Sequence, residues 1–218
     1  GCCFEISLNE NSRTKLKKNF KMSTITDNTH DISYKTLTRF IIDEQIKHSG
    51  TGQLSQLMSA IQTACKAISS LVRKEGIAKL HRNEGPHAPT GITQEKLDDL
   101  SNQLFLNALN NSHSVCCMVS ENNEQLIHIP LPKQGKYSVV FDPLDGSSNI
   151  DCLGPVGSIF GIYEYTKDAD RAGSHEEHVL QPGRNFIAAG YTLYGSATVM
   201  VIAIKWSGVN GFTLDPSI

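Results

Sequence analysis

The sequence predicts a layered α/β (α+β) domain, in which helices come first along the chain and a sheet follows. Between residues 35 and 108, apolar residues recur at the three-and-four spacing of amphipathic helices. From residue 114 onward they gather in short runs separated by turn residues, as in strands. The chain has 218 residues, 39% of them hydrophobic. This composition excludes a disordered tail and a coiled coil, and the length suits one large domain or one and a half.

Two helices are predicted first. The first covers residues 35–49 and is broken by the Gly-Thr-Gly sequence at 50–52. The second covers residues 54–74, where the apolar residues share one helical face, and it is expected to end at Gly76.

A polar stretch rich in Pro and Gly follows at residues 81–91, and it predicts a loop that could act as a lid. Thr93 is the candidate N-cap of a third helix. This helix would carry one apolar face, formed by Leu97, Leu100, Leu104 and Ala108.

The second half of the chain contains six strand candidates. The segment at 199–206 contains alanine and could equally continue a helix. His175 and His178, with two Glu residues between them, resemble metal ligands, but the charged and Gly-containing neighbours favour a solvated loop. The candidate strands are residues 114–120, 137–141, 156–163, 186–191, 199–206 and 211–214.

Two of these strands end on a carboxylate. Glu121 follows the first strand, Asp142 follows the second, and Asp145 lies one turn later. If the strands are near neighbours, the three acids come together and repel one another unless a cation lies among them. Oxygen ligands without a nearby His or Cys favour Mg²⁺ or Mn²⁺ over zinc, and the carbonyl of Leu144 would point the same way.

A turn suited to phosphate follows directly, at Gly146, Ser147 and Ser148. Glycine permits close approach of the backbone, and successive N–H groups at a turn can hold a phosphate. Metal ligands beside such a turn indicate metal-assisted phosphoryl hydrolysis. The alternative is that Asp-Pro-Leu-Asp-Gly is simply a favourable turn sequence after a strand.

The sequence Asp-Pro-Leu-Asp-Gly-Ser-Ser-Asn-Ile-Asp-Cys at 142–152 resembles the signature of the fructose-1,6-bisphosphatases (class 1), sugar phosphatases of gluconeogenesis. The similarity extends from about Leu37 to the end of the chain. It implies the sugar-phosphatase fold, with helices packed on a mixed sheet, and hydrolysis of the 1-phosphate of fructose 1,6-bisphosphate to fructose 6-phosphate. It also implies Mg²⁺ as cofactor (or Mn²⁺ or Zn²⁺), a cytoplasmic location and a homotetramer when full length. Further matching segments are 50–54, 66–74, 96–102, 135–137, 180–185 and 189–198.

The resemblance also implies a role for each site residue. Asp98 matches an acid that helps to activate the attacking water; judged from the helix pattern alone, it would be a solvated helix residue. The residues implied to bind metal are Glu121, Asp142, Asp145 and the carbonyl of Leu144. Those implied to hold the substrate phosphate are Asp145, Gly146, Ser147 and Ser148.

Two positions near this site depart from the family pattern. The family has two adjacent Glu residues where this chain has Glu121 and Asn122, and the second Glu pairs with the Asp98 equivalent to accept a proton. Asn cannot take a proton near neutral pH, and general-base assistance typically contributes about 10²–10⁴-fold in rate. Ile92 replaces an Asp of the mobile loop, which removes a negative charge from the closed lid.

The family's AMP-inhibition site is matched only in part. Thr51, Gly52, Lys136 and Tyr137 agree with it, and a helix start offers free N–H groups to a phosphate. In contrast, Gln53 and Ser55 replace Glu and Thr, and Glu164 stands at the position of an Arg. Because a carboxylate there repels the nucleotide, we expect weakened AMP inhibition.

The resemblance divides the chain into three parts. Residues 1–21 are expected to be a disordered leader or upstream sequence, 22–210 an N-terminal domain with the metal and AMP-type sites, and 211–218 the start of an incomplete substrate domain. The chain thus resembles the front part of a sugar phosphatase. A second hypothesis is a catalytically impaired paralogue that acts as a binding or regulatory module. A third, a relative acting on inositol or nucleotide phosphates, is disfavoured by the Ser-Asn-Ile-Asp extension.

The net charge and the cysteine content limit which binding partners and which cellular compartment we expect. The formal net charge is −2, which argues against wholesale binding to nucleic acid or anionic lipid, and no apolar run approaches a membrane span. The chain has 6 cysteines and no Cys-x-x-Cys. Buried reduced thiols in a cytosolic protein are therefore expected, rather than a disulfide framework or a zinc site.

Overall fold

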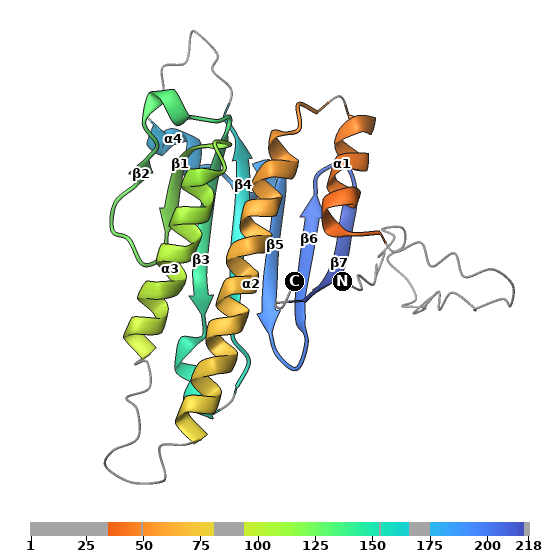
Figure 1. Cartoon of the computed structure of the whole chain (residues 1–218). Helices are drawn as coiled ribbons and strands as arrows, with labels where there is room; N and C mark the ends of the chain where they lie inside the picture. The colour runs from red at the N-terminus through yellow and green to blue at the C-terminus, as the bar shows by residue number, and fades with distance from the viewer. Residues whose placement is uncertain (1–34, 49, 81–93, 153, 166–174, 216–218) are drawn as a thin grey trace, which may run out of the picture.

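The computed structural model describes residues 35–48, 50–80, 94–152, 154–165 and 175–215, and it shows three long helices on one face of a sheet (Figure 1). The expectations for 1–21, for the loop at 81–91, for Ile92 and for the Thr93 cap lie outside these residues. The helices are α1 (Leu37–Lys47), α2 (Gln53–Leu80), α3 (Gln94–Asn111) and the short α4 (His175–Val179). The strands are β1 (Val115–Ser120), β2 (Ile127–His128), β3 (Tyr137–Asp145), β4 (Gly157–Glu164), β5 (Ala188–Tyr194), β6 (Thr198–Ile204) and β7 (Gly208–Leu214).

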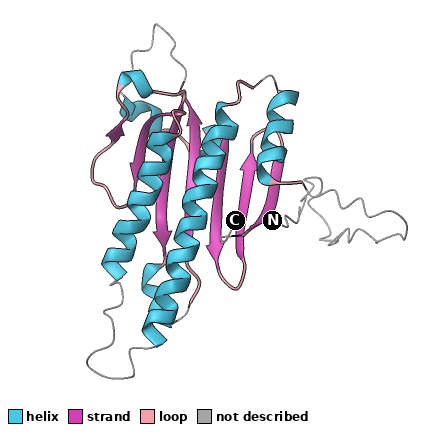
Figure 2. Ribbon diagram, in the orientation of Figure 1, coloured by secondary structure: helices cyan, strands magenta, loops and turns pink. Residues whose placement is uncertain are grey.

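The sheet is mixed and has seven strands in the order β2-β1-β3-β4-β5-β6-β7. β1 and β3 are parallel, whereas every other neighbouring pair is antiparallel. Figure 2 shows the separation of the two layers, with helices in front of strands. The predicted fold class, helices packed on a mixed sheet, is confirmed.

Helix α2 is longer than its sequence signals suggest. It was expected to end at Gly76, but it continues to Leu80. Glycine inside a helix costs only about 1 kcal/mol relative to alanine. The apolar face of α2 is buried from Leu54 to Ile68, and such a small local cost does not end a helix that is already formed.

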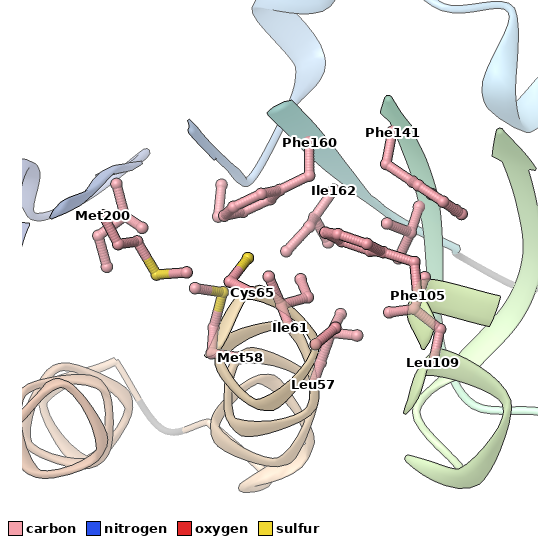
Figure 3. Close-up of a cluster of buried hydrophobic side chains, with 14 of the residues drawn as sticks. Leu57, Met58, Ile61, Cys65, Phe105, Leu109, Phe141, Phe160, Ile162 and Met200 are labelled. Atoms are coloured by element: carbon pink, nitrogen blue, oxygen red, sulfur yellow. The ribbon is translucent and has the colours of Figure 1, made fainter. Parts of the chain in front are cut away.

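The main core lies between the helices and the sheet (Figure 3). The rings of Phe105 on α3 and Phe141 on β3 stack with centroids 4.9 Å apart and planes 15° from parallel. This stack fixes α3 over β3, directly beside the residues that follow Phe141. Other members of the core labelled in Figure 3 are Leu57, Met58, Ile61, Cys65, Leu109, Phe160, Ile162 and Met200.

The tertiary structure settles two ambiguous segments. Residues 198–204 form strand β6, not a helix, because alternate side chains are buried against the core. Residues 175–179 form the short helix α4, so the loop expected around His175 and His178 is wrong there. α4 contacts β1 and β3, which gives the segment a surface on which to order.

Strand β7 crosses the domain boundary expected at residue 210. It pairs with β6 along its whole length, from Gly208 opposite Ile204 to Leu214 opposite Thr198. Phe212 and Leu214 belong to the main core. Residues 211–214 are therefore part of this sheet.

Gly135 lies where the backbone before β3 crosses Ser114, and replacing it with Ala is expected to destabilise the fold by about 1–3 kcal/mol, as overpacking does. A Cβ there would lie 2.0 Å from the carbonyl carbon of Ser114. The matched control is Gly211→Ala, whose Cβ would find its nearest neighbour, Val201, at 4.0 Å. Urea denaturation of both variants measures the difference. Equal stability of the two variants would contradict the prediction.

Candidate active site

Glu121 and Asp142 are brought together by the parallel pairing of β1 and β3. Ser120 pairs with Phe141, and the N–H of Glu121 donates to the carbonyl of Phe141 at 3.0 Å. Both strands run toward the lower end of the molecule in Figure 1. Glu121 directly after β1 and Asp142 within the last part of β3 therefore lie at the same end of two neighbouring strands.

The segment Asp142–Asp145 continues β3 with an irregularity in its pairing to β4. Asp142 pairs with Ile159 and Asp145 with Gly157, and the register shifts between these pairs. The N–H of Leu144 donates to Oδ1 of Asp142 at 3.0 Å, and Oγ of Ser158 donates to the carbonyl of Pro143 at 2.7 Å. These contacts hold the acidic segment at the strand end.

Asp98 faces the Gly-Ser turn from the first turns of α3. Oγ of Ser147 donates to Oδ2 of Asp98 at 3.1 Å, and Nε2 of Gln94 donates to the same Oγ at 3.1 Å. Oδ1 of Asp98 is buried and has no hydrogen-bond partner among the described residues. Gly146 begins the turn with φ of +75°, a left-handed conformation that favours glycine. Gln94 is a site residue that no sequence signal indicated.

Burial and neighbouring carboxylates disfavour the charged forms of Asp142 and Asp98. Burial raises the pKa of Asp142, and the hydrogen bond from the N–H of Leu144 lowers it in part. The negative charges of Asp145, Glu121 and Asp98 raise it further. Burial also raises the pKa of Asp98. The hydrogen bond from Ser147 lowers this pKa in part, and the charges of Asp99 and Glu121 raise it further. A cation placed among these groups would relieve this repulsion.

The set is loose, however. Within the ranges that the structure describes, no three His, Cys, Asp or Glu side chains converge closely enough to hold one ion. Glu121 and Asp145 are exposed, so their side chains can turn. Carboxylate donors, mutual repulsion and the unpaired Oδ1 of Asp98 all fit a hard divalent cation.

Asn122 lies exposed on the turn after β1. Its N–H donates to Oγ of Ser120 at 3.3 Å, and that hydroxyl donates to Oδ1 of Asn102 on α3 at 2.7 Å. Nδ2 of Asn102 donates in turn to Oδ1 of Asn123 at 2.9 Å. Neutral amides thus tie this turn to α3. The role of Asn102 had no sequence signal.

The AMP-type residues lie at the other end of the molecule, where α2 and β3 begin (Figure 1). Gly52 has φ of +85°. Oε1 of Gln45 accepts hydrogen bonds from the hydroxyl of Ser55 and, at 3.0 Å, from its N–H. The side chain of Gln45, on α1, therefore already accepts a hydrogen bond from the N–H of Ser55. A phosphate bound at the start of α2 would need that N–H. Oε1 of Gln53 is buried there, without a partner among the described residues.

Lys136 is paired with Glu164 across β3 and β4. Its Nζ lies 3.1 Å from Oε1 of Glu164 and 5.3 Å from the centroid of the Tyr137 ring. Burial opposes the charge of Lys136, but the hydrogen bond and charge of Glu164 raise its pKa overall. The cation expected to meet a nucleotide phosphate therefore already has an anionic partner.

Helices on one face of a mixed sheet, with acidic strand ends beside a Gly-Ser turn, are the architecture of a sugar-phosphatase N-terminal domain. Residues 35–218 match the family model for the N-terminal domain of fructose-1-6-bisphosphatase. The chain therefore belongs to the fructose-1,6-bisphosphatase family.

Relatives and solved structures agree with this assignment. Over 188 residues the chain is 53% identical to fructose-1,6-bisphosphatase 1 of Rattus norvegicus, covering 86% of this chain and 50% of the relative. It is 48% identical to a cytosolic fructose-1,6-bisphosphatase of Solanum tuberosum, covering 87% and 55%. The holo form of the Leishmania major enzyme is 40% identical with a TM-score of 0.70, covering 84% of this chain and 55% of that one. The chain thus spans about half the length of these relatives.

Proposed function

We propose that the chain is the metal- and phosphate-binding part of a fructose-1,6-bisphosphatase, which hydrolyses the 1-phosphate of fructose 1,6-bisphosphate to fructose 6-phosphate. The observation that carries this proposal is the contact of Asp98 with Ser147, next to the acidic ends of β1 and β3. It joins a proton acceptor, a phosphate-binding turn and metal-type ligands in one place. Family membership supports the substrate, because the relatives are named for it.

In this proposal each group has a separate task. Glu121, Asp142, Asp145 and the Leu144 carbonyl would hold Mg²⁺, with Mn²⁺ and Zn²⁺ as alternatives. When bound, the ion supplies Lewis-acid stabilisation and a more acidic water. Asp145 and the turn formed by residues 146–148 would hold the phosphate. Asp98 would orient water and accept its proton, a task for which a raised pKa is suited.

Substitution of Asn122 in a hybrid enzyme tests the proposed catalytic function. Joined to the C-terminal half of the rat relative, the chain is expected to release phosphate from fructose 1,6-bisphosphate in the presence of Mg²⁺. In that hybrid, Asn122→Glu is expected to raise turnover by about tenfold or more, because it restores a second proton acceptor. Asn122→Gln, which remains a neutral amide, is the matched control. Equal turnover of the Glu and Gln variants would refute the role given to this position.

The second candidate function is a catalytically impaired module that binds metal or ligand without turnover. The observation that favours it is the neutral side chain of Asn122, on a turn that Ser120, Asn102 and Asn123 tie to α3 through uncharged hydrogen bonds. The same hybrid separates the two candidates. Mg²⁺ binding without phosphate release, even after Asn122→Glu, would support the second.

We also infer that AMP binds weakly, because Lys136 is already paired with Glu164. Glu164→Gln is expected to tighten AMP binding by up to about fivefold, because an exposed ion pair contributes about 0.2–1 kcal/mol. The control is Asp43→Asn, which breaks a pair with Lys35 on α1. Calorimetric titration with AMP measures both variants. An unchanged affinity in Glu164→Gln would argue against competition for Lys136.

Location and assembly belong to the same proposal. We propose a cytoplasmic protein that forms a homotetramer when full length, as the family resemblance implies. The naming of the Solanum tuberosum relative as cytosolic supports the location. Among the described residues, no helix has the length and apolar character needed to span a membrane.

A further inference from the structure

Cys116 and Cys117 are neighbours on β1, and both side chains lie on the same side of the strand. Val115 pairs with Tyr137 and Cys117 with Ser138, so Cys116 is the extra residue of a bulge. The two Sγ atoms are 3.8 Å apart, and they lie 3.3 and 3.2 Å from Oγ of Ser138. In a regular strand, adjacent side chains would point to opposite faces. The bulge therefore creates a thiol pair.

This thiol pair lies apart from the main core. Tyr137 and Val139, on either side of Ser138, face the long helices and belong to that core, whereas neither cysteine does. Figure 1 shows α4 behind the sheet at β1, and α4 contacts both β1 and β3. The thiols are thus buried on the face of the sheet away from the long helices, the face on which α4 lies, and toward the opposite end of β1 and β3 from Glu121 and Asp142.

The sulfur separation distinguishes two kinds of thiol chemistry. A disulfide requires sulfurs about 2.0 Å apart and Cα atoms at least about 4.4 Å apart. Adjacent residues have Cα atoms only about 3.8 Å apart. Two thiolates bound at about 2.3 Å to one tetrahedral centre lie about 3.8 Å apart, and they lie somewhat closer on a pyramidal centre such as trivalent arsenic. The observed 3.8 Å is far too long for a disulfide, and only a small approach of the two sulfurs would let them share one soft pyramidal centre.

The pair can supply a thiolate near neutral pH. Hydrogen bonding from Cys117 lowers the pKa of Cys116 to about 7; burial opposes this shift and the hydroxyl of Ser138 assists it. In contrast, burial raises the pKa of the single Cys65 to about 11. Because soft centres bind thiolates, the Cys116–Cys117 pair is expected to be more reactive toward them than Cys65.

Access to the pair requires only a local opening. Both thiols are fully buried, but β1 is flanked on one side only by the two-residue strand β2, and it contacts the five-residue helix α4. Such short elements open at lower free energy than the core. Binding is therefore expected to be slow and to follow this opening.

We propose that Cys116 and Cys117 form a chelating dithiol site for a thiophilic centre of the trivalent-arsenical class. With an organoarsenical oxide, two As–S bonds replace the bonds from arsenic to oxygen. The two thiol protons leave with that oxygen as one water, and no oxidation state changes. A single thiol cannot form this chelate, and closing the second bond within one molecule raises affinity by about 10²-fold or more.

The test uses phenylarsine oxide on the full chain carrying Cys2→Ser and Cys3→Ser, which removes the other adjacent pair. We expect one arsenical per chain and the loss of two titratable thiols by intact mass and thiol assay. A small dithiol should reverse the adduct, whereas excess glutathione should not. Peptide mapping should place it at residues 116–117.

Cys117→Val is expected to weaken binding by about 10²-fold or more, to the level of a single thiol. Cys65→Ala and Cys152→Ser are the matched controls and should leave binding unchanged. Mapping on the parent chain decides the outcome even if Cys117→Val fails to fold. An adduct at Cys65 or Cys152, a stoichiometry of zero, or release by glutathione would overturn the proposal.

Discussion

Replacing Phe105 with Ala is expected to lower the free energy of unfolding by about 3–5 kcal/mol. The side chain is completely buried, and its ring stacks on that of Phe141 at 4.9 Å. Removing the ring leaves a cavity between α3 and β3 that two regular elements cannot collapse to fill. Urea denaturation followed by circular dichroism measures the loss.

The same substitution should loosen the candidate site, because Phe105 lies on the helix that carries Asp98 and packs on the residue before Asp142. Phe105→Leu keeps most of the buried volume and is expected to cost clearly less. Ile46→Ala provides an exposed control, since that side chain on α1 is 73% exposed. A loss below about 1 kcal/mol in Phe105→Ala would mean that the stack does not hold α3 on the sheet.

Asp142→Asn is expected to make the metal-free chain more stable at neutral pH and to abolish its stabilisation by Mg²⁺. Burial and the charges of Asp145, Glu121 and Asp98 raise the pKa of Asp142, so its ionised form disfavours the folded state. Asn removes that charge while keeping the shape. It also removes a ligand, and a cation that binds only the folded state stabilises it by mass action.

The pH dependence of stability is an independent check that Asp142→Asn stabilises the metal-free chain at neutral pH. Because the folded-state pKa of Asp142 is raised, protonation favours folding as the pH falls from neutral through that pKa. The stability advantage of Asp142→Asn over the parent chain should therefore begin to shrink as the pH falls through the raised pKa, and it should disappear only below the ordinary pKa that Asp142 has in the unfolded chain. A comparison between the two proteins cancels the contribution of Glu44, whose lowered pKa acts in the opposite direction.

Glu124→Gln is the matched control for Mg²⁺, because Glu124 is an exposed carboxylate on the turn after Glu121 and lies outside the proposed ligand set. It should retain the full rise in melting temperature on adding Mg²⁺. Thermal melts with and without Mg²⁺ at several pH values provide all the comparisons. An unchanged Mg²⁺ response in Asp142→Asn would remove Asp142 from the proposed ligands.

Local patterning allowed most elements to be predicted. The three longer helices follow from their apolar periodicity, and the six longer strands from short apolar runs separated by turn residues. Where local signals were weak, the surrounding structure decided. Gly76 did not end α2, residues 198–204 became a strand by pairing with β5 and β7, and α4 ordered against β1 and β3.

The sequence by itself determined which residue types stand at each strand end: Glu121 and Asn122 after β1, two acids in the last part of β3, and a Gly-Ser turn beside them. Only the tertiary structure decided which of these residues meet. The Asp98–Ser147 contact, the Lys136–Glu164 pair and the thiol pair at the β1 bulge all depend on register between distant segments. The spacing of residues along the chain determines on which face of a helix or strand each side chain lies. Which residue it meets on the neighbouring element depends on how the helices and strands pack together.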